Sequence, residues 1–333
     1  MSISRRSVLS LLSVAAFPGA ALAQARREAT GEKLMAVIWA LPEADSRLPG
    51  SVVAVLEGLA AEGWIEGENL RFEARAGGLD RSTARANTQE LAMLRPDVFI
   101  SAGLTVTQEV IDYGGAFPIV FFAVVDPVAA GFVQTLSRPG GNVTGFTNVD
   151  PSLGGKWLDL LRQVRPGLSH ATLMFNPQLS ETGTHYIQSF LEAADTLRIV
   201  ANAVPISGSQ DIAEAVDAIS AQPLGGVVVS TDAFLLIRRQ EVVREIARVG
   251  VPAVYGYRDY VEEGGLMAYS ADPNVWFRGV GAYAGRILKG ELPGELPVQF
   301  PNVFRLSINL RTAADLGIDI PVSLLAVADD VVE

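Results

Sequence analysis

Small polar and aromatic side chains follow the predicted ends of several β-strands. In an open parallel sheet, ligands bind beyond the carboxyl ends of the strands, so these positions are candidates for a binding site. The candidates are Trp39, Ser101, Gly103, Leu104, Thr105, Asp126, Asn148, Asn176, Thr231, Asp232, Tyr255, Tyr257 and Tyr269. Hydroxyl, amide and aromatic groups dominate this set, and only two members are carboxylates. The set predicts a site for a neutral or zwitterionic organic molecule of modest size.

The turn at residues 101–105 is the most informative of these positions. A predicted strand ends here, Gly103 lets the backbone turn tightly, and Thr105 begins a helix. The free N–H groups at the start of a helix can bind an anion such as a carboxylate. The alternative is that Ser101 and Thr105 only cap the helix with their hydroxyl groups. The sequence leaves these two roles about equally open.

Each of the two candidate aspartates has a binding role and a structural role. Asp126 can hold the ammonium group of a ligand, or it can stabilise a turn before Pro127. Asp232 can contact the ligand, or it can cap the helix that it begins. The sequence favours the turn slightly for Asp126, and capping is the more frequent role for an aspartate in the position of Asp232.

The aromatic candidates can cover the apolar body of a ligand. They are Trp39 and the three tyrosines at positions 255, 257 and 269. A tyrosine ring can stack on an aromatic ligand while its hydroxyl group makes a polar contact. Each tyrosine can equally be part of the ordinary packing near a hinge.

Residues suited to catalysis or metal binding are scarce. The chain has two histidines and no cysteine, which excludes disulfides, thiolate nucleophiles and thiolate metal sites. Neither His170 nor His185 stands near a serine–acid arrangement that suggests a catalytic triad. The sequence contains no clustered carboxylate motif and no phosphate-binding glycine motif. We therefore expect a protein that is not an enzyme, with no catalytic residue, no metal and no cofactor.

Composition and charge limit the possible partners. With 333 residues the chain is long for one compact core and sufficient for two. Hydrophobic residues make up 49% and charged residues 19%, as in a folded globular protein. The formal net charge of −11 argues against nucleic acid, whose phosphates need a basic surface, and against docking on anionic lipid. A small-molecule ligand fits these limits.

Residues 1–23 have the features of an export signal. Arg5 and Arg6 precede an apolar run, and Ala21-Leu22-Ala23 is an A-x-A cleavage site. The arginine pair also resembles the twin-arginine export consensus, so the export route stays open. The apolar run is too short to span a bilayer, and without cysteine the chain has no lipid attachment site. We predict cleavage after Ala23 and a periplasmic protein; the alternative is a leader retained as an anchor.

Apolar runs of strand length alternate with amphipathic helical segments along the chain. Strands are predicted at residues 34–40, 70–75, 97–102, 118–122, 143–146, 170–175, 199–205, 225–230, 251–255, 266–270 and 304–308. Helices are predicted at residues 51–63, 80–94, 105–113, 153–164, 182–197, 209–221 and 275–288, with one more ending at residue 249 and a short one from residue 311. This alternation predicts right-handed βαβ units and therefore an α/β fold with parallel sheets.

Two Rossmann-like lobes joined by a multi-strand hinge accommodate these elements. The first lobe is expected to comprise residues 33–145 and 267–296, and the second residues 146–266 and 297–333. The stretch 117–148 is interpreted as the seam between the lobes, with its polar residues forming one wall of a ligand-binding cleft.

Several runs of the chain resemble a known family. They are residues 120–148 (VFFAVVDPVAAGFVQTLSRPGGNVTGFTN), 154–158 (GGKWL), 59–70 (LAAEGWIEGENL), 95–98 (RPDV), 175–177 (FNP) and 308–317 (INLRTAADLG). These runs are similar to those of ABC-transporter substrate-binding proteins that include the tryptophan-binding TrpX type. The resemblance covers nearly the whole chain after the leader and implies the type I periplasmic binding protein fold.

The resemblance also implies a role. It predicts the periplasmic component of an ABC importer, which binds a small organic solute such as an amino acid or an aromatic acid. The expected partners are this solute and an ABC permease in the inner membrane, with no nucleic acid, and the protein is expected to be a monomer. Two alternatives stay open: a ligand-sensing periplasmic subunit for a membrane receptor, and an exported α/β enzyme that acts through carboxylates.

Overall fold

The computed structural model describes residues 31–40, 48–76, 80–113, 117–147, 150–177 and 182–333. The chain divides into two compact units. Unit 1 consists of Met1–Asn148 and Pro273–Pro301, and unit 2 consists of Val149–Asp272 and Asn302–Glu333. The chain therefore passes from one unit to the other three times, which is the connectivity that a multi-strand hinge requires.

Unit 1 is built on a fully parallel five-stranded sheet with the strand order β2-β1-β3-β4-β5. The strands are β1 (Lys33–Ile38), β2 (Leu70–Arg75), β3 (Val98–Ala102), β4 (Ile119–Phe122) and β5 (Val143–Phe146). Every residue of β3, β4 and β5 is buried. Strands that are apolar on both faces need helices on both sides of the sheet, which is the arrangement observed.

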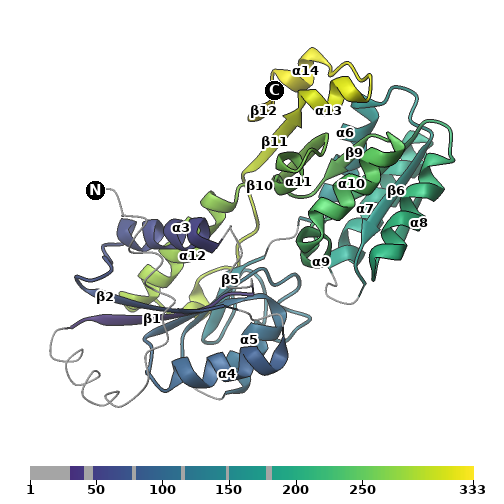
Figure 1. The fold of residues 1–333 in the computed structure, drawn as a ribbon. Helices are drawn as coiled ribbons and strands as arrows, with labels where there is room; N and C mark the ends of the chain where they lie inside the picture. The colour runs from purple at the N-terminus through teal and green to yellow at the C-terminus, as the bar shows by residue number, and fades with distance from the viewer. Residues whose placement is uncertain (1–30, 41–47, 77–79, 114–116, 148–149, 178–181) are drawn as a thin grey trace. The chain divides into compact units, whose positions relative to one another are not determined.

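Two pairs of helices cover the faces of this sheet (Figure 1). One face packs against α3 (Leu48–Ala61) and α12 (Pro273–Leu288), and the other packs against α4 (Arg81–Ala92) and α5 (Gly103–Asp112). Helices α3 and α12 approach closely because glycines face the opposing backbone. A Cβ atom added at Gly281 would lie 2.0 Å from the carbonyl oxygen of Val55. Close contact with α3 thus fixes α12 on unit 1.

Unit 2 is built on a seven-stranded sheet with the order β12-β11-β10-β9-β8-β6-β7. Its strands are β6 (His170–Phe175), β7 (Val200–Pro205), β8 (Gly225–Val229), β9 (Ala253–Tyr255), β10 (Met267–Ala271), β11 (Phe304–Asn309) and β12 (Asp330–Val332). All neighbouring strands are parallel except β10 and β11, which are antiparallel. The prediction of parallel sheets is confirmed. The one antiparallel pair, β10 and β11, occurs where the chain re-enters unit 2.

Helices cover the sheet of unit 2 as well. They are α6 (Leu153–Val164), α7 (Thr182–Leu197), α8 (Ser209–Ser220), α9 (Ala233–Ile237), α10 (Arg239–Val249) and α11 (Asp259–Glu262), followed near the C-terminus by α13 (Leu310–Asp315) and α14 (Val322–Leu325). Helices α8 and α10 pack on one face, and α6 and α7 pack against each other on the opposite face (Figure 1). The core of unit 2 is therefore also a sheet between two helical layers.

The predicted lobes and the observed units differ in one strand. Strand β10 was expected in the first lobe, but it pairs with β9 and β11 and belongs to unit 2. Two further contacts connect Asp272, just after β10, to the region of β11. The Asp272 N–H donates to the carbonyl of Val303, just before β11, at 2.9 Å, and the Asp272 carboxylate forms an ion pair with Arg305 of β11. The stretch 117–148 contains β4 and β5 of unit 1, so its chain crossing lies at its very end.

Some short elements differ from the predictions. The single helix predicted up to residue 249 is two helices, α9 and α10, which are separated at Arg238 by a backbone conformation of φ −96° and ψ 17°. Four short elements were not predicted from the sequence: α11, α14, β12 and the 3₁₀ turn at Pro293–Glu295. Within the described ranges, no helix is long and apolar enough to cross a membrane.

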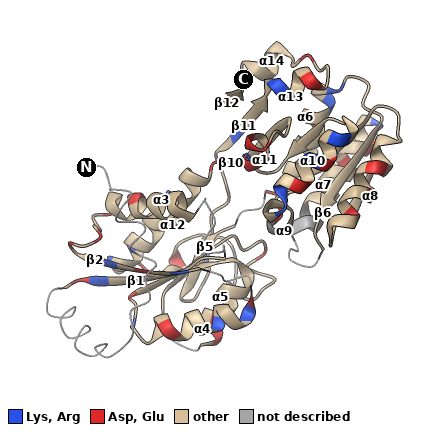
Figure 2. Ribbon diagram, in the orientation of Figure 1, with Lys and Arg blue, Asp and Glu red and all other residues tan. Residues whose placement is uncertain are grey.

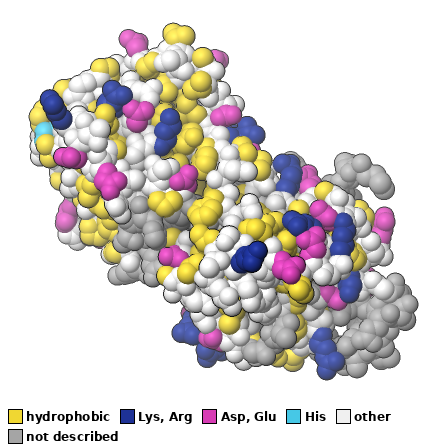
Figure 3. Space-filling model, turned by 180° about the vertical axis from the view of Figure 1, so that it is seen from behind, with side chains coloured by type: hydrophobic (Ala, Val, Ile, Leu, Met, Phe, Trp, Pro, Cys, Tyr) yellow, Lys and Arg dark blue, Asp and Glu magenta, His cyan; other side chains and the backbone are white. Residues whose placement is uncertain are grey.

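Charges lie mainly on the outer elements. Figure 2 shows acidic and basic residues on helices such as α4 and α10, while the strands of unit 2 that are drawn near α10 are largely neutral. On the face drawn in Figure 3, described basic and acidic side chains are intermingled, and neither sign gathers into a broad patch. That face offers no extended basic surface of the kind that nucleic acid needs.

Candidate ligand-binding site

The start of α5 is the first part of the candidate site. Ala102 is the N-cap residue, and no side chain caps the helix. Gly103 has a φ of +73°, which favours glycine and makes the tight turn that the sequence predicted. The backbone N–H groups of the first turn of α5 are thus left without a side-chain cap. A helix start in this state can bind a carboxylate.

The hydroxyl of Ser101 has another role. Its Oγ lies 2.9 Å from the Oγ1 of Thr107, which in turn donates to the Gly103 carbonyl at 2.7 Å. This network is buried and braces the turn from inside unit 1. The alternative prediction that Ser101 and Thr105 cap the helix is therefore wrong. Thr105 is half-buried and Leu104 is 48% exposed on the same first turn.

Asp126 follows β4 and stabilises a turn. Its Oδ1 accepts hydrogen bonds from the N–H groups of Val128 at 3.1 Å and Ala129 at 2.9 Å, and its carbonyl accepts one from Ala130. The turn role is therefore confirmed. Asp126 is only half-buried, so its carboxylate is partly open to solvent.

Sheet register brings the unit 1 candidates to one edge. Ile38, the last residue of β1, pairs with Ser101 of β3, and Ala102 pairs with Phe122 of β4. Trp39, the turn 101–105 and the loop that contains Asp126 therefore leave neighbouring strands at the same edge. A Cβ atom on Gly103 would lie 3.9 Å from the Ala123 carbonyl, which shows that the loops after β3 and β4 are adjacent.

An aromatic cluster borders the same edge. Trp39 and Phe122 are buried, with ring centroids 5.3 Å apart, and Phe277 lies 5.7 Å from Trp39 and 5.5 Å from Phe122. Trp276 lies 5.6 Å from Phe122 and 5.0 Å from Phe277. The Nε1 of Trp39 is buried and has no hydrogen-bond partner in the described part of the chain. Phe122, Trp276 and Phe277 are not among the site residues predicted from the sequence.

The sequence contains only a partial indication that Trp276 and Phe277 belong near this edge. Trp276 and Phe277 are adjacent aromatic residues near the start of a predicted helix, a position that suggests a surface rather than a core. They reach the edge because α12 packs on the sheet of unit 1. The Trp276 Nε1 donates to the Thr147 carbonyl at 3.2 Å, which fixes the first turn of α12 beside the end of β5.

In unit 2, Asp232 organises the candidate residues. Its Oδ1 accepts from the Leu235 N–H at 3.0 Å, so it caps α9, and its Oδ2 accepts from the Asn176 N–H at 3.2 Å. The side chain of Asn176 donates to the Ile206 carbonyl at 2.7 Å. Asp232 and Asn176 are each 1% exposed. The capping role of Asp232 is confirmed, and these two residues connect the ends of β6 and β8.

Thr231 belongs to the same buried framework. Its Oγ1 donates to the hydroxyl of Tyr186 on α7 at 2.7 Å. Burial of the Tyr186 hydroxyl raises its pKa, so it stays protonated at ordinary pH. Next to Thr231, the Oγ of Ser230 is buried without a hydrogen-bond partner among the described residues.

The three candidate tyrosines have different environments. Tyr255 is 1% exposed and stacks on Tyr260 with centroids 4.7 Å apart, so its ring is part of the core, and burial raises the pKa of its hydroxyl. Tyr257 is half-buried against the same core. Tyr269 is half-buried and stacks on Phe304 with centroids 5.5 Å apart, and burial raises the pKa of its hydroxyl. Asn148, the remaining candidate, lies outside the described residues.

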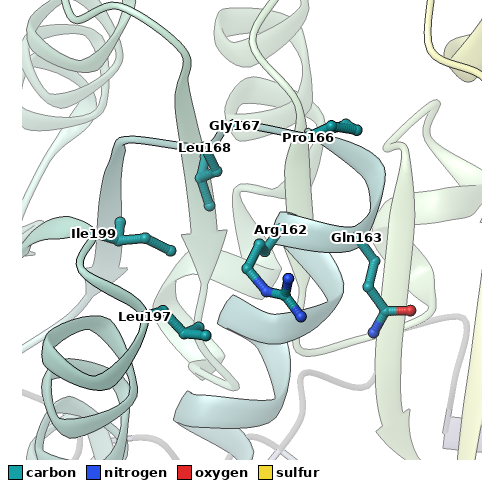
Figure 4. Close-up of a pocket in the computed structure, with 7 residues that line it drawn as sticks. All are labelled: Arg162, Gln163, Pro166, Gly167, Leu168, Leu197 and Ile199. Atoms are coloured by element: carbon teal, nitrogen blue, oxygen red, sulfur yellow. The ribbon is translucent and has the colours of Figure 1, made fainter.

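A hollow elsewhere on unit 2 does not coincide with these residues. It is lined by Arg162, Gln163, Pro166, Gly167, Leu168, Leu197 and Ile199 (Figure 4). Leu168 and Ile199 precede β6 and β7, so the hollow lies at the amino ends of these strands, opposite the edge where ligands of such sheets bind. Across the ranges that the structure covers, no group of three or more His, Cys, Asp or Glu side chains could hold a metal ion.

Comparison with known proteins supports a binding role. The family of ABC transporter substrate-binding proteins matches residues 37–332. A tyrosine-binding protein from Clostridioides difficile is 23% identical over 262 residues, which covers 77% of this chain and 73% of that protein.

Solved structures share the fold. A conserved domain protein from Vibrio cholerae has a TM-score of 0.79 at 25% identity, covering 90% of this chain and 99% of that one. An ABC domain from Streptococcus pneumonia in complex with L-Trp has a TM-score of 0.80 at 21% identity, covering 90% of this chain and all of that one. The expected type I periplasmic binding protein fold is confirmed. The chain belongs to the family of ABC transporter substrate-binding proteins, which bind small solutes and work with ABC permeases.

Proposed function

We propose that this protein delivers an amino acid to an ABC importer, and that the edge of unit 1 holds the α-carboxylate and α-ammonium groups. The observation that carries the proposal is that the uncapped start of α5 and the half-buried Asp126 follow the adjacent strands β3 and β4. A donor site for an anion and an acceptor site for a cation follow adjacent strands, which matches the two charges of a zwitterion. The tyrosine-binding relative and the L-Trp complex support an amino acid as the ligand class.

The α5 start is the proposed carboxylate site. Backbone N–H groups in the first turn carry partial positive charge and need no rearrangement to accept an anion. Thr105, half-buried on this turn, supplies a hydroxyl that can donate a further hydrogen bond. Gly103 keeps the approach open because it has no side chain above the turn.

Asp126 is the proposed ammonium site. Its Oδ1 already accepts two backbone N–H groups, but an ionised carboxylate has about four acceptor positions. Asp232, the other candidate, is less suited because it is almost fully buried and both of its oxygens accept backbone N–H groups. We therefore assign the ammonium contact to Asp126.

Residues of unit 2 are proposed as further candidates for ligand contacts. Tyr257 and Tyr269 are half-buried at or after strands β9 and β10, where they can cover the apolar part of a solute. We propose an indirect role for three buried residues of unit 2, Asn176, Thr231 and Asp232. Their side chains are fixed by the hydrogen bonds described above and would support the residues that contact the solute.

We also propose the setting in which the protein acts. The leader at residues 1–23 supports export to the periplasm with cleavage after Ala23, by the general or the twin-arginine route. The net charge of −11 supports a protein that does not bind nucleic acid, and we propose a monomer without enzymatic activity.

A ligand screen tests the proposal. The purified mature protein would be heated with each of the common amino acids, and a ligand that binds the folded state should raise the melting temperature. Calorimetry on the hits would give affinities, and native mass spectrometry of freshly extracted protein would identify any solute that co-purifies. The proposal fails if no amino acid shifts the melting temperature or binds in calorimetry, or if the co-purifying solute lacks either charge.

A further inference from the structure

We propose that the aromatic cluster of unit 1, formed by Trp39, Phe122, Trp276 and Phe277, binds the ring of an aromatic amino acid and gives the protein its preference for that class. This inference rests on the proposed function, because it adds a side-chain subsite to the proposed amino-acid site. Phe122, Trp276 and Phe277 are then specificity-determining residues.

The cluster is continuous with the proposed carboxylate site. Phe122 is the register partner of Ala102, the N-cap residue of α5, on the neighbouring strand. Trp39 directly follows Ile38, which pairs with Ser101. A ligand whose carboxylate sits at the α5 start therefore has the aromatic cluster beside it, on the face of the sheet that α12 covers.

Burial within the cluster is graded. Trp39 and Phe122 are 1% and 5% exposed and form its base, whereas Trp276 and Phe277 are half-buried. The four rings meet edge to face, with interplanar angles of 60° to 85°. Such an arrangement accepts a further ring because edge-to-face and offset contacts are the favoured geometries between aromatic side chains. A ligand ring would contact the exposed parts of Trp276 and Phe277, because Trp39 and Phe122 are almost fully buried.

The position of Trp276 is fixed rather than variable. Its Nε1 donates to the Thr147 carbonyl at 3.2 Å, and the hydroxyl of Thr147 donates to the Val125 carbonyl at 3.3 Å. Trp276 is thus linked through Thr147 to the loop that also contains Asp126. A preorganised ring surface costs little ordering on binding, which favours affinity.

Calorimetry with matched ligands and variants tests this inference. The ligands are L-tyrosine, L-tryptophan and L-phenylalanine, compared with L-leucine and L-valine. The variants are Trp276→Leu and Phe277→Leu, which keep an apolar side chain and remove the ring. Trp64→Leu is the control, because Trp64 is also half-buried against the same core and its Nε1 donates to a backbone carbonyl of α12, that of Gly285, at 2.9 Å.

Selectivity is the quantity to compare. We expect the wild type to bind its preferred aromatic amino acid at least about tenfold more tightly than L-leucine, since one good aromatic contact is worth roughly that factor. Trp276→Leu or Phe277→Leu should reduce this ratio about tenfold and leave the affinity for L-leucine within about threefold. Trp64→Leu should leave the ratio unchanged.

The outcomes separate the two proposals. If the wild type binds L-leucine as tightly as every aromatic amino acid, the aromatic subsite is wrong while the amino-acid site stands. The same conclusion follows if both ring-removing variants fold and keep the wild-type ratio. If no amino acid binds the wild type, the proposed function itself fails, and the inference fails with it. Because the wild-type ratio needs no variant, misfolding of one variant does not prevent the test.

Discussion

The two units treat the carboxyl ends of their strands differently. In unit 2, polar side chains in this region bind one another or the backbone: Asp232 caps α9 and accepts from Asn176, and Thr231 donates to Tyr186. In unit 1, the start of α5 has no side-chain cap, and half-buried aromatic rings border it. Unit 1 also has internally bonded polar groups at Ser101 and Asp126, but its α5 start and half-buried rings are suited to a ligand. The polar groups described above in unit 2 form a hydrogen-bonded framework instead.

This contrast has a physical reason. A buried carboxylate such as that of Asp232 needs several hydrogen bonds, so the structure satisfies it internally, and it then contributes to stability. The first-turn N–H groups of α5 need no internal partner if they are exposed to water or to a ligand. An aspartate at a strand end can thus have either role: the buried Asp232 has a structural role, and the half-buried Asp126 is the one that we propose to bind a ligand.

Removal of the Asp232 carboxylate should have the largest effect. Asp232→Ala removes the cap of α9 and the acceptor of the Asn176 N–H, and leaves buried donors unpaired. We expect the free energy of unfolding to fall by about 3 kcal/mol, measured by urea denaturation followed by circular dichroism. Asp232→Asn keeps one carbonyl oxygen for the cap and should lose less. Wild-type stability in the alanine variant would show that unit 2 does not depend on this framework.

Removal of the Asp126 charge should act on binding instead. Asp126→Asn keeps a carbonyl oxygen that can accept from the N–H groups of Val128 and Ala129, so the turn should persist. Loss of a charge-assisted hydrogen bond costs about 1.5–3 kcal/mol, so affinity for the amino acid should fall roughly tenfold to a hundredfold.

A ligand without the amino group gives the control for this variant. Binding of 3-phenylpropionate, which keeps the carboxylate and the ring, should be the same in wild type and Asp126→Asn. Calorimetry with both ligands decides the assignment. An equal loss for the two ligands would mean that Asp126 acts through the turn and not through the ammonium group.

Much of the fold was predictable from the sequence. The bounds of β2, β5, β6, α6 and α7 agree with the predicted ranges, because apolar runs of clear period lie between polar, glycine or proline positions. The break between α9 and α10 falls at Arg238, where neither glycine nor proline marks it. Strand β12 has only three residues and depends on pairing with β11, so no local pattern could reveal it.

The candidate site was only partly predictable. The turn at Gly103 follows from a local rule, and so do the turn role of Asp126 before Pro127 and the capping role of Asp232 before a predicted helix. The partner of Ser101, by contrast, is Thr107, which only the folded turn brings within 2.9 Å.

The return of α12 to unit 1 was predicted, because residues 267–296 were expected in the first lobe. Trp276 and Phe277 were still missed, because their rings meet Phe122 and Trp39 only through the packing of α12 on the sheet. Such packing is a long-range feature of the fold, and no local spacing encodes it.

An ion pair on the helical layer of unit 1 should have a smaller, pH-dependent effect. Glu109 of α5 is 3% exposed and is bound by Arg81 and Arg85 of α4, with N···O distances of 2.5 and 2.8 Å. The hydrogen bonds from Arg85 and Arg81 lower the pKa of Glu109 below its ordinary value. A carboxylate with a lowered folded-state pKa stabilises the protein above its unfolded pKa, and this contribution is lost as the pH falls through the folded value.

The corresponding variant is Glu109→Gln. It should cost about 1 kcal/mol at pH 7, because both arginine partners are largely exposed to solvent. The difference from wild type should narrow as the pH falls below about 4, because the glutamate of the unfolded chain is then protonated while the lowered pKa of the folded state resists protonation. Urea denaturation at pH 7, 5 and 3.5 measures this. A difference that stays constant over this range would mean that the side chain contributes through packing rather than charge.

The smallest effect should come from the hydroxyl group of Tyr269 in unit 2. Its ring stacks on Phe304 at 5.5 Å, and the Nζ of Lys156 lies 5.7 Å from the ring centroid. If unit 2 contributes apolar cover, the ring matters and the hydroxyl does not. Tyr269→Phe should then change ligand affinity less than about threefold, while Tyr269→Ala, which removes some of the ring contacts, should reduce it about tenfold. A tenfold loss of ligand affinity in Tyr269→Phe would show instead that the Tyr269 hydroxyl forms a hydrogen bond to the ligand. Unit 2 would then contribute a polar contact as well, and the contrast between the two units would be wrong in this respect.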